Sequence, residues 1–127
     1  MRTRLAGLSL TVLLLAAAFC CALTAGAGAQ TAHASAKCSL GKDGRKLGAT
    51  YVTSLKVTRV SCSSGKKVVK AYNACRRAHG GVKGRCSKKV LGYHCSETRK
   101  SIPTEFTATV GCKAGSRRVN FKYTQFT

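Results

Sequence analysis

Acidic residues are nearly absent from this chain. Its 127 residues include three Asp plus Glu against 23 Lys plus Arg, which gives a formal net charge of +20 at pH 7. This imbalance excludes an acidic or neutral cytosolic housekeeping fold as the natural first hypothesis. Hydrophobic residues nevertheless make up 44% of the chain, too many for a wholly disordered basic tail. The length allows one small domain.

Signatures of common catalytic and metal sites are also missing. No G-x-S-x-G or P-loop pattern occurs, and the single Asp, Asp43, sits in a glycine-rich loop. Zinc sites usually contain closely paired Cys, whereas consecutive Cys after position 37 are 24, 13, 11, 9 and 17 positions apart. We therefore expect no metal and no cofactor, and we favour a protein that is not an enzyme.

The first 36 residues have the layout of a secretory signal. Arg2 and Arg4 precede an uncharged run over residues 5–23, and a tract of small residues follows. Three small-x-Ala sites are candidates for cleavage, after Ala29, Ala34 or Ala36. Residues 37–127 then form a single basic domain. An uncleaved membrane anchor stays open as the alternative, because the uncharged run is just long enough to span a bilayer.

One helix is predicted after residue 62. Apolar residues recur there at helical spacing, namely Val68, Ala71, Tyr72, Cys75 and Ala78. Most of the neighbouring Lys and Arg fall off this stripe. A Ser at position 61, 63 or 64 can serve as the N-cap, and Gly80 with Gly81 supplies the stop.

Period-two alternation predicts strands around this helix. They cover residues 51–58, 104–112 and 117–126, with a shorter strand over residues 90–95. Residues 113–116 suit a hairpin loop, and residues 39–48 are expected to be a basic loop or leader. Most aromatic residues are assigned to the core, and those that follow the helical stripe or the strand alternation are Tyr72, Phe106, Phe121 and Tyr123. The expected fold is α+β, with one amphipathic helix packed on a small antiparallel sheet.

Six Cys remain once Cys20 and Cys21 are assigned to the signal. In an exported chain of this size an even number predicts three disulfides, because the compartment is oxidising and a small core gains from cross-links. Six Cys permit fifteen pairings. The predicted order of elements favours a nested set, which pairs Cys75 with Cys86, Cys62 with Cys95 and Cys38 with Cys112.

The stretches VSCSSGKKVVKAYNAC, VLGYHC and VGCKAGSRRVNF resemble blocks found in small exported disulfide-containing proteins of unknown function from actinobacteria. The likeness covers most of the chain after the predicted signal and depends on Cys, Gly and apolar spacings. It implies a disulfide-stapled domain that is secreted or associated with the cell envelope. It implies no catalytic residue.

Positive charge is the strongest functional signal. If the helix and the following loop share one side of the sheet, their cations concentrate a positive field that attracts polyanions. The expected partners are anionic envelope glycans, lipid head groups or nucleic acid, bound by a monomer through salt-sensitive contacts of low specificity. The alternative is that these cations only form a solvated surface. The expected binding residues are Arg76, Arg77, Lys83, Arg85, Lys88 and Lys89.

Two further functions remain open as alternatives. A secreted protease inhibitor could present basic residues on the loop that a Cys75–Cys86 disulfide closes. A metal-independent nuclease needs an acid, a base and cations around the phosphate. The candidates for the acid and the base are His79, His94, Glu97 and Glu105. The simpler interpretation places His79 at the helix end, His94 on the sheet surface and both Glu beside Lys or Arg.

Overall fold

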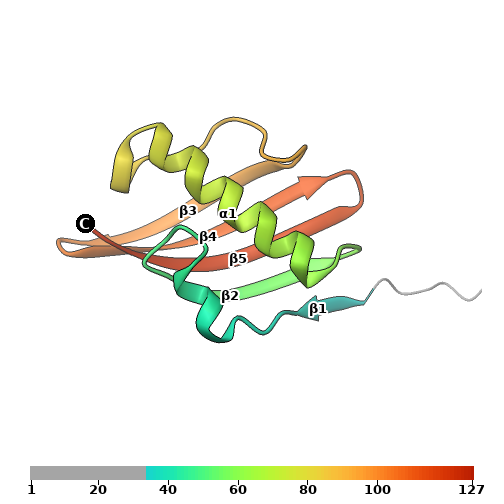
Figure 1. The fold of residues 1–127 in the computed structure, drawn as a ribbon. Coiled ribbons are helices and arrows are strands. Elements are labelled where there is room, and N and C mark those ends of the chain that lie inside the picture. The colour runs from blue at the N-terminus through green and yellow to red at the C-terminus, as the bar shows by residue number, and fades with distance from the viewer. Residues whose placement is uncertain (1–33) are drawn as a thin grey trace, which may run out of the picture. The chain divides into compact units, whose positions relative to one another are not determined.

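The computed structural model of the protein describes residues 34–127 (Figure 1). The predicted signal, with Cys20 and Cys21, lies outside these residues apart from positions 34–36. The elements in chain order are β1 (Ser35–Lys37), the 3-10 helix η1 (Gly41–Arg45), β2 (Tyr51–Thr58), α1 (Cys62–Ala78), the 3-10 helix η2 (Gly81–Lys83), β3 (His94–Ile102), β4 (Glu105–Ala114) and β5 (Arg117–Phe126). Within the described part, no helix is both long and apolar enough to cross a membrane.

The five strands form one antiparallel sheet in the order β1-β2-β5-β4-β3, and α1 lies across one face of it (Figure 1). The predicted α+β fold is therefore confirmed. We call the face under α1 the inner face and the opposite one the outer face. The cleavage predicted after Ala36 would fall inside β1, whereas cleavage after Ala29 would leave this strand whole.

Strand alternation builds the core as predicted on β4 and β5, whereas a bulge between Val52 and Ser54 on β2 buries Val52 and leaves Thr53 exposed. On β5, Val119, Phe121 and Tyr123 are buried, and the residues between them point to the outer face. The ring of Phe121 meets Tyr72 of α1 edge to face, with 5.6 Å between the ring centroids. Phe106 on β4 is buried as well. All four aromatic residues that follow the predicted periodicity are thus in the core.

Helix α1 begins where predicted, and the surface that it buries is wider than the predicted stripe. The Ser61 hydroxyl accepts a hydrogen bond from the Ser64 backbone amide at 3.1 Å, so Ser61 is the N-cap. Val68 and Tyr72 are buried as expected, whereas Ala78 is exposed. The buried residues of the helix are Gly65, Val68, Val69, Tyr72, Asn73 and Arg76. Two polar residues therefore point into the interior.

The predicted strand over residues 90–95 is misplaced. Val90 makes only an isolated bridge with Tyr93, and β3 begins at His94 and continues to Ile102. Residues 96–101 lack apolar alternation, because the inner face of β3 carries Glu97 and Arg99 instead of apolar side chains. Strand β1 was not predicted, and the loop expected over residues 39–48 contains η1.

Three disulfides are present, but only one predicted pair is correct. Cys75 binds Cys86 as expected. The predicted pairs Cys62–Cys95 and Cys38–Cys112 are wrong, because Cys95 lies near the start of β3, directly opposite Cys112 on β4, with 4.0 Å between the Cα atoms. Those two residues therefore bind each other. Cys38, which follows β1, binds Cys62 in the first turn of α1.

Candidate anion-binding surfaces and the buried polar network

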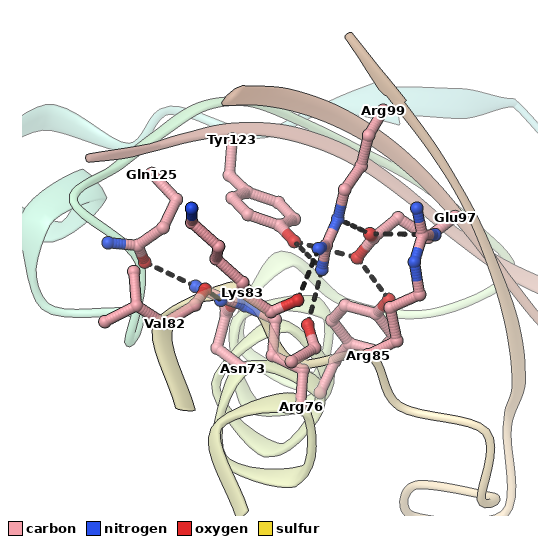
Figure 2. A network of polar contacts seen from close by, with 11 residues as sticks. Asn73, Arg76, Val82, Lys83, Arg85, Glu97, Arg99, Tyr123 and Gln125 are labelled. Carbon is pink, nitrogen blue, oxygen red and sulfur yellow. Dashed lines mark hydrogen bonds and ion pairs between the residues drawn. The ribbon is translucent and has the colours of Figure 1, made fainter. Parts of the chain in front are cut away.

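A carboxylate is enclosed between α1 and the sheet. Glu97 lies on the inner face of β3, with its side chain 4% exposed. It accepts hydrogen bonds from the Tyr72 hydroxyl at 2.5 Å and the Tyr123 hydroxyl at 2.7 Å, and it forms an ion pair with Arg99 (Figure 2). Arg85 adds a longer contact of 3.5 Å. Every direction open to this carboxylate is therefore occupied by a donor.

The surroundings of Glu97 fix the protonation states in the network. Burial alone would raise the pKa of Glu97, but the hydrogen bonds from Tyr72, Arg99 and Tyr123 outweigh it, and the pKa lies below the ordinary 4.5. Burial, followed by the hydrogen bond to the carboxylate, raises the pKa of both Tyr72 and Tyr123. At neutral pH the carboxylate is thus charged and both hydroxyls are donors.

Arg76 of α1 is fully buried beside this carboxylate. Its guanidinium donates to Asn73 Oδ1 at 2.7 Å, to Gln125 Oε1 at 2.6 Å and to the Val82 carbonyl at 2.8 Å (Figure 2). It also lies over the Tyr123 ring, 4.8 Å from the centroid. Burial lowers the pKa of Arg76, although an Arg side chain stays protonated at any ordinary pH.

Two buried arginines hold the segment between α1 and β3. Arg76 donates to the Val82 carbonyl, and Arg99 donates to the carbonyls of Lys83 at 2.7 Å and Gly84 at 2.5 Å (Figure 2). The Cys75–Cys86 disulfide closes the same segment. Among the described residues, no buried polar side-chain atom lacks a hydrogen-bond partner. The network therefore positions this loop.

Five of the six predicted binding residues are exposed. We call them the helix-side cations; they are Arg77, Lys83, Arg85, Lys88 and Lys89. All belong to the segment that runs from the end of α1 toward β3, and the buried arginines and the disulfide fix its first half. Arg76 is the exception, because its side chain points into the interior. It therefore leaves the proposed binding set.

The histidines proposed for a nuclease lie far apart. His79 is the C-cap of α1, and its Nδ1 is 2.7 Å from the Cys75 carbonyl. The two histidines can be located by their positions along β5. Arg76, near the same end of α1 as His79, contacts Gln125 of β5. His94 is aligned across the sheet with Arg118 of β5. Positions 118 and 125 are separated by roughly 23 Å along β5. The two imidazoles therefore cannot act as acid and base on one phosphodiester.

The loop proposed for a protease inhibitor has a helical turn and inward-facing carbonyls in the part before Arg85. Residues Gly81–Lys83 form η2, and the carbonyls of Val82, Lys83 and Gly84 point inward to the two arginines. Peptides that add to a sheet edge offer an extended backbone whose amides and carbonyls are free to pair. This arrangement gives no support to an inhibitory role for the loop.

The few acidic groups contribute little negative charge to the surface. Asp43 pairs with Lys66 at 2.7 Å, and the hydrogen bond and charge of Lys66 lower the pKa of this carboxyl. Glu97 is enclosed. Glu105 is half-buried and forms no ion pair within residues 34–127. Positive charge therefore dominates the exterior of the described domain.

A second group of cations was not identified from the sequence. Six basic residues point away from α1, on the outer face of the sheet, and we call them the outer-face cations; they are Lys37, Lys56, Lys100, Lys113, Arg118 and Lys122. They lie on all five strands. The period-two alternation already placed residues such as Lys56 on the polar side of a strand. The order of the strands, which brings them together, has no local signal in the sequence.

Within residues 34–127, no group of three His, Cys, Asp or Glu side chains is arranged to hold a metal ion. The cysteines that are close to His79 and His94 in sequence are bound in disulfides.

Comparison of the chain with known protein families, with curated proteins and with solved structures gave no match.

Proposed function

We propose that this protein binds anionic polymers through its helix-side cations, by charge and with little sequence or structural specificity. The observation that carries the proposal is the distribution of charge: two of the three acidic groups are paired or enclosed, while the helix-side cations are exposed. A surface of one sign attracts polymers of the opposite sign and speeds their association.

The segment between α1 and β3, which carries most of the helix-side cations, is held to the rest of the fold by a disulfide and hydrogen bonds, and this supports the proposed role. Disulfide Cys75–Cys86 and the hydrogen bonds from Arg76 and Arg99 order the backbone that carries Lys83 and Arg85. A preordered backbone loses less conformational entropy on binding than a flexible one. Three disulfides are also typical of domains that function in an oxidising compartment, so envelope glycans, lipid head groups and extracellular nucleic acid are the polyanions that we propose it meets.

Fluorescence anisotropy of a labelled single-stranded RNA with the oxidised protein tests this proposal. The variant Lys83→Gln/Lys88→Gln/Lys89→Gln removes three charges from the proposed surface. The matched control Lys42→Gln/Lys46→Gln/Lys67→Gln removes three exposed charges around η1 and the first half of α1. The loss of three phosphate contacts is expected to weaken binding roughly 100-fold at 0.1 M salt.

The control variant is expected to lose less than about tenfold, because it weakens only the long-range field. Equal losses in both variants would mean that total charge, and not this surface, decides binding. Decay of the anisotropy below its starting value, in the presence of a chelator, would mean cleavage and would support the nuclease alternative instead.

A further inference from the structure

We propose that the outer face of the sheet is a second, independent binding surface, and that its partner is a hydroxyl-rich acidic glycan chain. This inference adds a site to the proposed function. Helix α1 covers the inner face, and no helix within residues 34–127 covers the outer face of the five-stranded sheet (Figure 1).

Charge over most of the outer face is of one sign, and the exception, Glu105, lies at the end of this face where β4 begins. Across the register positions from His94 to Lys100 on β3 and the residues opposite them on the other strands, the side chains that point outward include no acidic residue. The outer-face cations form no ion pair within the described domain. An uncompensated cationic sheet face complements a polyanion.

Three of these cations line one shallow groove. A hollow of about 380 Å³ is lined by Lys100 and Lys122, and a neighbouring hollow of about 180 Å³ is lined by Lys56 and Lys122. The two hollows share Thr109 and Lys122, so together they cross the sheet diagonally from β2 to β3. Lys56 and Lys100 are separated by four residues along the strands and three strand spacings across them, which places their Cα atoms roughly 20 Å apart.

Uncharged hydrogen-bonding groups fill the spaces between the lysines. The outward side chains that make no side-chain hydrogen bond within residues 34–127 are Ser54, Ser96, Thr98, Thr107, Thr109, Asn120 and Thr124. Each offers a donor and an acceptor to a ligand. A polymer that carries hydroxyls as well as negative charge uses both kinds of group.

The lack of aromatic residues argues against single-stranded nucleic acid as the partner. Surfaces that bind single strands stack bases on aromatic rings. Neither hollow is lined by an exposed ring: Tyr51 and Phe126 share the outer face but pack on each other at one end of it, with 5.4 Å between their centroids, and the rings of Phe121 and Tyr123 are buried on the inner face. An acidic glycan needs cations and hydrogen-bonding groups, and the groove supplies both.

Two independent surfaces on opposite sides predict a stoichiometry. Isothermal titration calorimetry with a short polygalacturonate oligomer, too short to reach around the sheet, is expected to count two oligomers on the wild-type protein. The outer-face variant Lys56→Gln/Lys100→Gln/Lys122→Gln and the helix-side variant Lys83→Gln/Lys88→Gln/Lys89→Gln lose the same charge. Each is expected to bind one oligomer.

The outcomes separate this inference from the proposed function. If the outer-face variant keeps the wild-type stoichiometry, the second surface is disproved and the helix-side proposal stands. If the outer-face variant binds nothing while the helix-side variant behaves as the wild type, the helix-side proposal fails and the outer face stands. If the wild type binds no oligomer, the inference is overturned, and the RNA experiment above decides the proposed function separately.

A charge-neutral variant tests the class of polymer. Thr107→Val/Thr109→Val removes two hydroxyls and keeps both β-propensity and charge. In the helix-side variant background it is expected to weaken polygalacturonate binding about tenfold and to leave poly(U) binding unchanged. Equal effects on the two polymers, or tighter binding of poly(U) than of polygalacturonate to the helix-side variant, would overturn the glycan assignment.

Discussion

Two neighbouring arginines have opposite roles. Arg76 is enclosed and donates to three acceptors, whereas Arg77 is exposed at the next position of α1. Helical geometry turns successive side chains by about 100°, so the residue that follows a buried one can project into the solvent. One of the pair therefore serves the fold, and the other remains available to a ligand.

Substitution separates these roles. Arg76→Gln leaves buried acceptors without donors and is expected to lower the free energy of unfolding by roughly 3 kcal/mol. Arg77→Gln is expected to change it by less than about 0.5 kcal/mol. Urea denaturation of the oxidised variants at pH 7 measures both. Similar losses in the two variants would show that Arg76 is not buried as described.

Glu97 is the acidic residue on which the interior depends. Glu97→Gln leaves Arg99 buried without its counter-ion, and a loss of roughly 3 kcal/mol in the free energy of unfolding is expected at pH 7. Glu105→Gln is the matched control, because this half-buried residue forms no ion pair within residues 34–127, and its effect is expected to stay below about 0.5 kcal/mol.

Lowering the pH is expected to destabilise the protein through protonation of Glu97. The pKa of Glu97 is lower in the folded protein than the ordinary value of 4.5. Its ionisation therefore stabilises the fold at any pH above 4.5. This contribution is lost as the pH falls through the pKa of the folded protein. The free energy of unfolding of the wild type is therefore expected to decrease below about pH 4.5. The same measurement on Glu97→Gln is expected to give a flatter curve, and parallel curves would contradict this account.

At the scale of the elements, α1 approaches the sheet closely at Gly65. A Cβ atom built on this glycine would lie 2.6 Å from Val57 Cγ1 and 3.6 Å from Leu55 Cδ2. Alanine favours a helix by about 1 kcal/mol over glycine, but the forced overlap with a fully buried valine costs about 1–3 kcal/mol. Packing thus opposes helix propensity at this position.

We expect packing to prevail, so that Gly65→Ala lowers the melting temperature. The exposed Lys70→Ala, on the same helix, is expected to leave it nearly unchanged or slightly raised. Thermal unfolding followed by circular dichroism compares the two variants. A higher melting temperature for Gly65→Ala would show that α1 can move away from the sheet at little cost.

Some elements of the fold could be predicted from the sequence and others could not. Helix α1, β2, β4 and β5 could be predicted because their apolar residues recur at the period of the element that they form. Strand β3 was misplaced because Glu97 and Arg99 occupy its inner positions, where local patterning expects apolar residues. These two side chains are stabilised by partners far away in sequence, such as Tyr123, which a local pattern cannot reveal.

The misplaced strand also explains the two wrong disulfides. Once β3 starts at His94, Cys95 stands opposite Cys112, and Cys38 is left for Cys62. The residues proposed for binding could likewise be predicted only in part. Exposure of the helix-side cations followed from helix and loop positions, whereas burial of Arg76 depended on Gln125, which lies 49 residues away.

At the scale of the whole described domain, a scarcity of acidic residues is combined with a polar network buried beside an apolar core. The acidic residue with the most contacts, Glu97, is enclosed, and it organises donors from α1, β3 and β5. The exterior is left with cations on the helix side and on the outer face. The same few residues therefore explain the stability of the fold and the character of its surface.

Binding of polyanions by charge is the central claim of this account, and its salt dependence tests it most directly. We would measure the affinity of the oxidised wild-type protein for a labelled single-stranded RNA at several salt concentrations. Five phosphate contacts by the helix-side cations predict that the logarithm of the association constant falls against the logarithm of salt with a slope of about −3.5. An affinity that does not change with salt, or no binding at 0.15 M salt, would contradict the account.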